Sequence, residues 1–284
     1  MSSSRPPVVD FHLHLNRLDA SMRPSWVSYM GQKMGDRFGD VLESMMNRPA
    51  MEAFLDENGV DYAVCLADMS LLTTGLTPNE WVAEVCAGSP RLLPFGNINP
   101  ALTTRPADEL ERLVSELRIK GLKMYPSYQH FYPNDRSLYP LYAKAEERGL
   151  PVVFHTGLSM FEGSRVRYAQ PIYLDDLAVD FPSLTIVMAH AGRTAWFDEA
   201  WMLSRMHRHV FMEVSGLPPK KLLDYWPDLE RNADKILFGS DWEDVPSIKG
   251  NVEAIRALPI GEDAKQKILG ANAARILGLT SSTD

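Results

Sequence analysis

The sequence predicts a (β/α)8 barrel, the α/β fold in which eight parallel strands alternate with helices and close into one sheet. Short apolar or β-branched runs alternate with stretches of helical spacing along the 284 residues, and eight such alternations at this length are typical of that fold. The competing fold is an open, doubly wound sheet, which places Gly-x-Gly-x-x-Gly after its first strand. No such pattern follows the first strand here. We therefore expect a single domain over residues 1–284.

The predicted elements follow from composition, spacing and the residues that bound them. The strands are expected at residues 8–15, 61–67, 92–98, 120–125, 151–157, 184–192, 210–216 and 235–242. Between them lie amphipathic stretches, several of which begin with Pro and end with Gly or Pro, as helices do. These helices are expected at residues 49–59, 78–88, 106–118, 137–149, 172–182, 194–208 and 219–232. A last helical region is expected over residues 247–284.

The longest connection, residues 16–47, follows the first strand. It contains Trp26, Tyr29 and Met30 among several apolar residues, which must be buried against another part of the protein. This insertion is either a lid over the active end of the barrel or a helical segment packed on its rim. We expect it to cover the barrel mouth, with some of these three side chains lining a substrate pocket.

Charge and composition limit the partners and the location. The net charge is −8 and the pI is near 5.4, which argues against nucleic acid and against an anionic membrane surface. No apolar run reaches the ~18 residues that a membrane helix needs. The N-terminus shows no signal segment and the two cysteines give no disulfide framework. We expect a cytoplasmic protein that acts on a small molecule, and a homo-oligomer remains open.

Histidines gather where the predicted strands end. In the segment VVDFHLHLN, His12 and His14 lie two residues apart and so share one face of the first strand. Two imidazoles on one face pack poorly in a core but suit a metal site. The residues of chemical interest that close the first, fourth, fifth, sixth and eighth strands are His12, His14, Lys123, His155, His190 and Asp241. Barrel enzymes carry their chemistry at this rim, whereas His130, His207 and His209 lie outside the pattern and are expected to be surface or structural residues.

The ordered motifs closely resemble those of the amidohydrolase superfamily. His-x-His on the first strand, GLKMYP, FHTG, AHAG and FGSDW are similar to its amidohydrolase-related branch, which also contains non-oxidative decarboxylases. The resemblance extends from residue 8 to about residue 277. It implies that His12 and His14 bind a divalent metal together with Asp241, and that His155 binds that metal or a second one.

The residue types alone, without the family resemblance, also suit a catalytic metal site. Neutral imidazole and carboxylate suit zinc, which we expect first, with manganese or iron as alternatives. Such a metal lowers the pKa of bound water towards ~7, and Asp241 can pass the water's proton to a leaving group.

Lys123 separates a one-metal site from a two-metal site. Binuclear relatives carboxylate a lysine on the fourth strand, and the carbamate bridges both metals, with His155 and His190 completing the second site. In a one-metal site, Lys123 is an unmodified cation near the substrate and His190 is a free acid or base. A structural Lys123 paired with a carboxylate is the third interpretation.

The substrate prediction rests on loop residues near the rim. Aromatic and arginine side chains there suit an apolar or aromatic acid, whose carboxylate an arginine would bind through two hydrogen bonds. The candidates are Tyr125, Arg165, Arg193 and Trp242. Glu213 shares an inward parity with Ser215, but we interpret it as a carboxylate of the barrel interior and leave it outside the predicted site.

Three functions are compatible with this ligand set. The first is a metal-dependent hydrolase of an amide, ester or lactone. The second is a non-oxidative decarboxylase of an aromatic or unsaturated acid, with a single divalent metal and proton transfer by Asp241 or His190. The third is an iron-dependent oxygenase on the same ligands. Product analysis separates the first two, and metal analysis identifies the third.

Overall fold

Eight parallel strands form one sheet in the computed structural model, which describes residues 6–16, 21–39, 47–243 and 245–279. Their order in the sheet follows their order in the chain. The strands are β1 (Val9–His14), β2 (Tyr62–Leu66), β5 (Leu92–Gly96), β6 (Gly121–Met124), β7 (Val152–His155), β8 (Ile186–Ala189), β9 (Val210–Glu213) and β10 (Ile236–Leu237). Each predicted strand is present but shorter than predicted, because the chain turns into a loop soon after the residues that close each strand.

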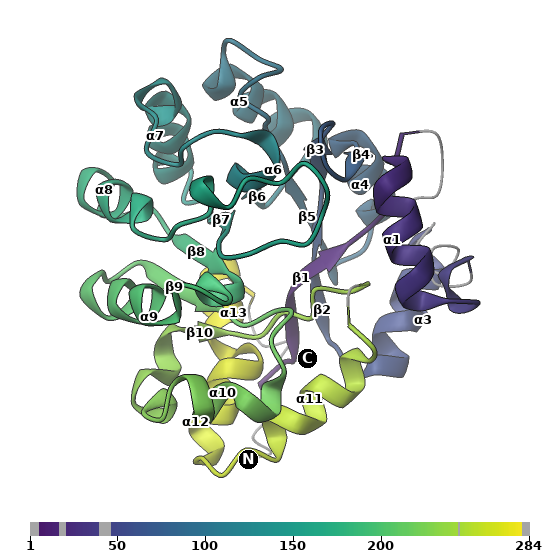
Figure 1. Cartoon of the computed structure of the whole chain (residues 1–284), viewed down its shortest axis with the longest axis vertical. Helices are drawn as coiled ribbons and strands as arrows, with labels where there is room; N and C mark the ends of the chain where they lie inside the picture. The colour runs from purple at the N-terminus through teal and green to yellow at the C-terminus, as the bar shows by residue number, and fades with distance from the viewer. Residues whose placement is uncertain (1–5, 17–20, 40–46, 244, 280–284) are drawn as a thin grey trace.

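The sheet closes between its first and last strands (Figure 1). The backbone N–H of Phe11 donates to the carbonyl of Phe238 at 3.0 Å, and the N–H of Asp241 donates to the carbonyl of His12 at 3.0 Å. These bonds join β1 to the chain that follows β10. The predicted (β/α)8 barrel is confirmed.

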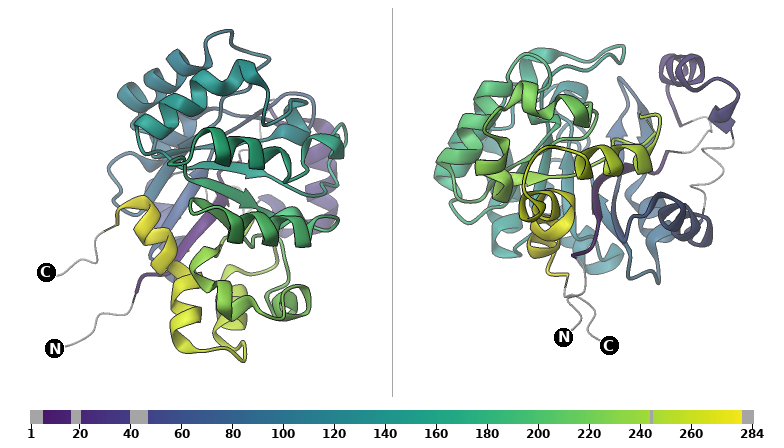
Figure 2. Two further views of the ribbon diagram at one scale, coloured as in Figure 1. Left: turned by 90° about the vertical axis from the view of Figure 1, so that its left-hand side faces the viewer. Right: turned by 90° about the horizontal axis from the view of Figure 1, so that it is seen from below.

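Most of the helices surround the barrel on its outer side, while α1 (Pro24–Met34) and α6 (Pro126–Gln129) lie at its mouth and α13 (Asn272–Leu277) packs against its inner layer (Figures 1 and 2). The other helices that the structure describes are α3 (Arg48–Asn58), α4 (Asn79–Cys86), α5 (Pro106–Leu117), α7 (Tyr139–Glu147), α8 (Tyr173–Asp180), α9 (Phe197–Met206), α10 (Leu222–Tyr225), α11 (Ile248–Arg256) and α12 (Glu262–Gln266). In α3, the Asn47 side chain accepts the N–H of Ala50 and caps the first turn, and Gly59 ends the helix with a positive φ. The helix predicted at 219–232 is divided, because Pro227 cannot continue a helix, into α10 and a 3-10 segment at Leu229–Lys235.

Apolar side chains form two layers on either side of the sheet. The inner layer fills the barrel and includes Val9, Phe11, Val153 and Val187, all buried. The outer layer packs the strands against the helices and is continuous around the barrel. Because the interior is filled, the barrel offers a pocket at the C-terminal ends of its strands rather than a channel through its centre.

One wall of the barrel mouth was not predicted as regular structure. A short antiparallel hairpin, β3 (Asp68–Ser70) and β4 (Gly75–Thr77), follows β2. The segment before α1 pairs with it, since the N–H of Leu76 donates to the carbonyl of Ser21 at 3.1 Å. Gly75 is required at this approach, because a Cβ there would lie 2.5 Å from the carbonyl oxygen of Ser21.

The insertion expected at residues 16–47 therefore contributes α1 to the mouth, beside the hairpin. Residues 17–20 and 40–46 of that insertion, and residues 280–284 of the C-terminal region, lie outside the described residues. In the part of the chain that the structure describes, no helix combines the length and the apolar character that crossing a membrane demands.

Candidate active site

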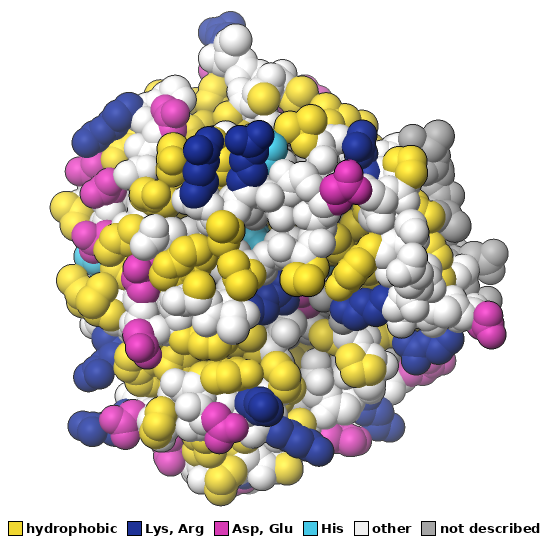
Figure 3. All heavy atoms as spheres, viewed as in Figure 1, with side chains coloured by type: hydrophobic (Ala, Val, Ile, Leu, Met, Phe, Trp, Pro, Cys, Tyr) yellow, Lys and Arg dark blue, Asp and Glu magenta, His cyan; other side chains and the backbone are white. Residues whose placement is uncertain are grey.

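A pocket of about 260 Å³ opens at the C-terminal ends of the strands, a volume that suits a small molecule. Figure 3 shows a hollow on the face of the molecule where this end of the barrel meets solvent. Barrel residues form its floor: His12, His14, Tyr125, Tyr128, His155, His190, Arg193 and Asp241. The insertion and the hairpin supply part of its walls, with Trp26, Tyr29, Met30, Asp68 and Thr74 among the lining residues.

An irregularity in β1 brings both of its histidines into the pocket. One extra residue lies in β1 relative to β2, between Asp10 and Leu13. Phe11 therefore packs inside the barrel, while Leu13 packs outside against the helices. The Asp10 carboxylate accepts the N–H of His12 at 3.1 Å and the N–H of Ser240 at 2.8 Å, which satisfies the backbone at the irregularity.

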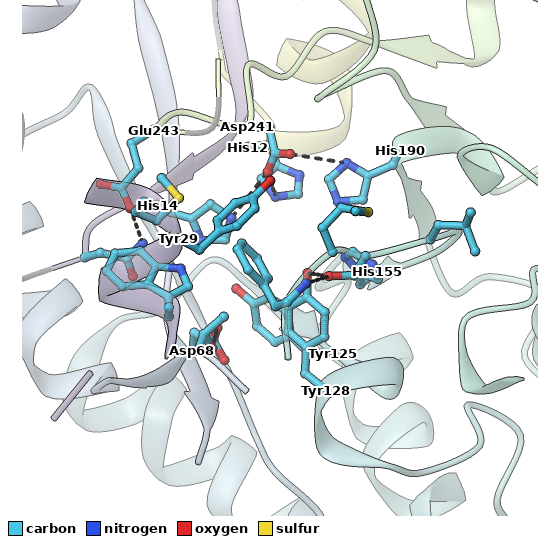
Figure 4. Close-up of a pocket in the computed structure, with 18 of the residues that line it drawn as sticks. His12, His14, Tyr29, Asp68, Tyr125, Tyr128, His155, His190, Asp241 and Glu243 are labelled. Atoms are coloured by element: carbon cyan, nitrogen blue, oxygen red, sulfur yellow. Dashed lines mark hydrogen bonds and ion pairs between the residues drawn. The ribbon is translucent and has the colours of Figure 1, made fainter. Parts of the chain in front are cut away.

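Three groups converge on one point at the pocket floor (Figure 4). The Nε2 atoms of His12 and His14 lie 3.3 and 3.5 Å from Oδ1 of Asp241. One ligand atom from each residue lies within 4.8 Å of the other two. Two imidazole nitrogens and a carboxylate oxygen are ligands that a divalent cation prefers, so this group could hold one.

Glu213 orients His12 from behind. Its Oε2 lies 2.8 Å from Nδ1 of His12, and the Ser215 hydroxyl donates to the same oxygen at 2.8 Å. A carboxylate on one ring nitrogen fixes the tautomer that leaves the other nitrogen free to bind a metal. Sequence reasoning left Glu213 outside the site, although its inward parity was the available signal. Burial raises the pKa of Glu213 to about 8.

A second group of three, His12, His190 and Glu213, also has ligand atoms within 4.8 Å of one another. The Ser215 hydroxyl occupies this space, at 3.1 Å from Nδ1 of His12 and 2.9 Å from Nδ1 of His190. These donors and acceptors therefore already satisfy one another. The group of His12, His14 and Asp241 is the better candidate for a cation, because it faces the pocket.

The surroundings of His155 also test whether the site suits a divalent cation. Its Nε2 is buried and has no hydrogen-bond partner among the described residues, which is costly for an imidazole unless a ligand meets it. Its ring centre lies 4.7 Å from that of His190. Burial lowers the pKa of His155 and of His190 well below the usual value, so both rings are neutral, the form that binds metals. The donor set fits a divalent cation.

The sequence predicted that His190 lies near the end of a strand. In the structure it follows the end of β8 and begins a 3-10 turn. Its Nδ1 lies 3.1 Å from the carbonyl oxygen of Ser215 and 3.8 Å from Oδ2 of Asp241. Burial alone would raise the pKa of Asp241, but the imidazole and guanidinium groups around it outweigh burial and hold that pKa well below its usual range. Asp241 is thus ionised and available to a cation or a proton.

Lys123 points into the floor of the site. It is fully buried, and its Nζ lies 3.3 Å from Nε2 of His12. Burial lowers its pKa to about 8. The structure therefore places this amine beside the candidate ligands. At this position an unmodified ammonium would repel a bound cation, whereas a carbamate would attract one.

The predicted substrate residues divide into two pairs. Tyr125 and Arg193 line the pocket, and Nη1 of Arg193 lies 3.5 Å from Oδ2 of Asp241. Arg165 and Trp242 are not among the described residues that line it, and a substrate-binding role for them stays a prediction. Arg165 is exposed in the loop after β7. Trp242 is buried and packs on Phe54, with ring centres 5.1 Å apart, because alternation turns it outward next to Asp241.

Several pocket residues escaped the sequence reasoning. Asp68 and Thr74 come from the hairpin, and the Asn16 amide donates to the Glu243 carboxylate at 2.6 Å on the same wall. The available signal for Asp68 was its position, two residues after the end of β2. Trp26, Tyr29 and Met30, expected to cover the mouth, all line the pocket.

Known proteins of similar structure share this barrel. An uncharacterized TIM-barrel protein from Bordetella bronchiseptica is 26% identical with a TM-score of 0.78, over 95% of this chain and 98% of that chain. A 5-carboxyvanillate decarboxylase from Sphingomonas paucimobilis is 21% identical with a TM-score of 0.64, over 96% and 99%. A dihydroxybenzoic acid decarboxylase from a Polaromonas species, solved with manganese and 2-nitroresorcinol, is 17% identical with a TM-score of 0.72, over 98% of both chains. The likeness to the two decarboxylases shows the fold.

The family is shown by the sequence match. The model of the amidohydrolase family matches residues 9–279, which is nearly the whole chain and includes every candidate ligand from His12 to Asp241. The chain belongs to the amidohydrolase family.

Proposed function

We propose that this protein is a metal-dependent, non-oxidative decarboxylase of an aromatic or unsaturated carboxylic acid. The observation that carries the proposal is the group of His12, His14 and Asp241 at the floor of a pocket walled by aromatic rings. Tyr125 and Tyr128 stack with ring centres 5.6 Å apart on one side of it. The similar barrels that act on 5-carboxyvanillate and on dihydroxybenzoic acid support this choice over hydrolysis.

A divalent cation would be held by His12, His14 and Asp241, with the unpartnered Nε2 of His155 facing the same pocket. When bound, it supplies positive charge that holds the substrate's carboxylate and withdraws electrons from it. Manganese is present in one of the similar barrels, and zinc suits the same ligands.

The protein's own residues then transfer the proton that the reaction requires. Decarboxylation breaks the bond between carbon and the carboxylate, releases carbon dioxide, and leaves an electron pair on carbon that must accept one proton. His190 and Asp241 lie 3.8 Å apart at the pocket floor, and we assign to this pair the transfer of one proton from solvent water to that carbon. Arg193, beside Asp241, supplies a fixed positive charge at the edge of the same floor.

Hydrolysis is the second candidate, and Lys123 is the observation that favours it. Its Nζ lies 3.3 Å from Nε2 of His12, a position from which a carbamate would reach a second metal. The same ligands would then serve to activate water rather than to hold a carboxylate.

The test is product analysis with manganese-loaded and zinc-loaded protein, in deuterium oxide for the acids and in oxygen-18 water for the amides, esters and lactones. We offer aromatic monocarboxylates such as 2,6-dihydroxybenzoate, the dicarboxylate 5-carboxyvanillate, and in parallel a set of aryl amides, esters and lactones. We expect an acid to release carbon dioxide and to gain one deuterium at the carbon that loses it, and His12→Ala to abolish both. Uptake of solvent oxygen into an amide, ester or lactone product, with no acid decarboxylated, would establish hydrolysis instead.

A further inference from the structure

A carboxylate outside the candidate metal ligands faces the same pocket. Asp68 begins β3, lines the pocket and is 4% exposed. In Figure 4 it lies across the pocket from His190 and Asp241, on the side of Tyr125. It is not a member of either group of ligand atoms that lie within 4.8 Å of one another. The candidate metal site therefore does not account for it.

Only one of the two oxygens of Asp68 has a hydrogen-bond partner in the part of the chain that the structure describes. Oδ2 accepts a hydrogen bond from the hydroxyl of Thr74 at 2.6 Å, which fixes the carboxylate across the hairpin. Oδ1 is buried and has no hydrogen-bond partner among the described residues. The Ser70 hydroxyl also has no partner among the described residues. Burial raises the pKa of Asp68, and the nearby Ser70 hydroxyl opposes that rise. A buried carboxylate oxygen without a donor is costly, which indicates that something else meets it.

Two donors that line the pocket wall are committed elsewhere, and Ser70, whose hydroxyl is uncommitted, is not among the described residues that line the pocket. The hydroxyl of Tyr125 donates to the carbonyl of Ala67 at 3.0 Å. The amide of Asn16 donates to Glu243 at 2.6 Å. Small rotations of these two side chains would break existing bonds, so a donor that reaches Oδ1 from the pocket side belongs to the molecule in the pocket.

We propose that Asp68 is a specificity-determining residue, which accepts a hydrogen bond from a hydroxyl or amino group of the substrate at the end remote from its reacting carboxylate. The substrate class is then a monocarboxylic acid with a hydrogen-bond donor on the side of the hairpin. Asp68 excludes a second carboxylate there, because two like charges would face each other in a buried site. This inference rests on the proposed function only in placing the reacting carboxylate at His12, His14 and Asp241.

The experiment measures binding rather than turnover. Manganese-loaded protein is titrated by calorimetry with benzoate, with 3- and 4-hydroxybenzoate and with 3- and 4-aminobenzoate. The methyl ethers, 3- and 4-methoxybenzoate, are titrated in the same way. We expect at least one hydroxy or amino acid to bind about tenfold or more tightly than its methyl ether, since a hydrogen bond to a charged group is lost with the donor. Benzene-1,4-dicarboxylate should bind more weakly than 4-hydroxybenzoate.

Two variants assign the preference to Asp68. In Asp68→Asn, the amide oxygen can still accept from Thr74, so the amide NH2 faces the pocket and turns an acceptor into a donor. The preference for the hydroxy or amino acid should vanish or reverse, and the dicarboxylate should gain affinity. The matched control, Thr74→Ser, keeps the hydroxyl that fixes Asp68 and should keep the wild-type preference.

Either of two results overturns the inference. In the wild-type protein, hydroxy, amino and methoxy acids bind within threefold of one another at both ring positions, a measurement that needs no variant to fold. Alternatively, Asp68→Asn keeps the full preference. Failure of the proposed function looks different: no acid loses carbon dioxide, while the binding preference and its loss in Asp68→Asn persist.

Discussion

Replacing Glu213 by glutamine should weaken metal binding without touching a ligand. The backbone N–H of Ser215 donates to Oε1 of Glu213, and Oε2 faces Nδ1 of His12 at 2.8 Å. In Glu213→Gln, the amide oxygen is needed to accept from Ser215, which turns the amide NH2 towards His12. Nδ1 must then accept, and the imidazole proton moves to Nε2. Nε2 is the atom beside Asp241, and a protonated nitrogen cannot bind a cation.

The size of the effect follows from the outer position of Glu213. Losing a carboxylate that orients a metal-binding histidine weakens affinity about 10- to 100-fold, which is about 1.4–2.7 kcal/mol. The pH dependence should change as well. Burial raises the pKa of Glu213 to about 8 and lowers that of Lys123 to about 8. Protons on either group oppose a cation, so wild-type affinity should rise as pH increases from 6 towards 8.

In the variant one of these protons is absent, so the slope of log affinity against pH should fall by about one proton. The assay is calorimetric titration of chelator-treated protein with manganese and with zinc, at several pH values. Glu199→Gln is the matched control, since Glu199 accepts the N–H of Ile172 at 2.7 Å far from the site, and it should bind metal as the wild type does. Affinity of Glu213→Gln within threefold of wild type, with the same slope and an intact fold, would refute the role assigned to Glu213.

Four further predictions address other parts of the structure. His12→Ala should lose the bound metal and all activity while circular dichroism stays unchanged, and wild-type metal content would contradict the ligand assignment. Under the proposed decarboxylation, elemental analysis should give one metal per chain, and carbon-13 NMR with labelled bicarbonate should show no carbamate on Lys123. Two metals and a carbamate would favour hydrolysis instead. Tyr29→Ala, at the mouth, should weaken substrate binding about tenfold but leave metal affinity unchanged, and calorimetry with each ligand checks both. Burial raises the pKa of Asp10 to about 6, above its unfolded value, so its contribution to stability is complete below about pH 4 and is lost as pH rises to 6, a change of about 3 kcal/mol. In Asp10→Asn, the free energy of unfolding measured with urea should lack this pH-dependent contribution. The same pH profile of unfolding free energy in the variant and the wild type would contradict the prediction.

The barrel and its rim were predictable because they depend on local patterns. Each strand is a short apolar run, and residues that close successive parallel strands meet at one edge of the sheet. His155 and His190 lie 35 positions apart in the sequence, yet neighbouring strands β7 and β8 bring their rings within 4.7 Å. No pairwise information was needed for that prediction, only the fold class and the strand ends.

The parts that could not be predicted depend on contacts between distant segments. The hairpin that carries Asp68 has strands of three residues each, too short for an alternation pattern to be recognised. The contact between Glu213 and His12 crosses the barrel between residues 201 apart in the sequence. Arg165 differs from Arg193 only in whether its loop turns towards the pocket or towards solvent, which no local pattern decides.

The irregularity in β1 explains why the metal site depends on Asp10. At the start of β1, the odd residues Val9 and Phe11 pack inside the barrel. Regular alternation from that start would turn His12 outward, towards the helices. The extra residue shifts the register against β2, so that His14 pairs with Leu66 and Leu13 turns outward instead. The N–H groups left at this shift belong to His12 and Ser240, and the Asp10 carboxylate accepts both. Asp10 thus holds the backbone in the one register that places both imidazoles beside Asp241.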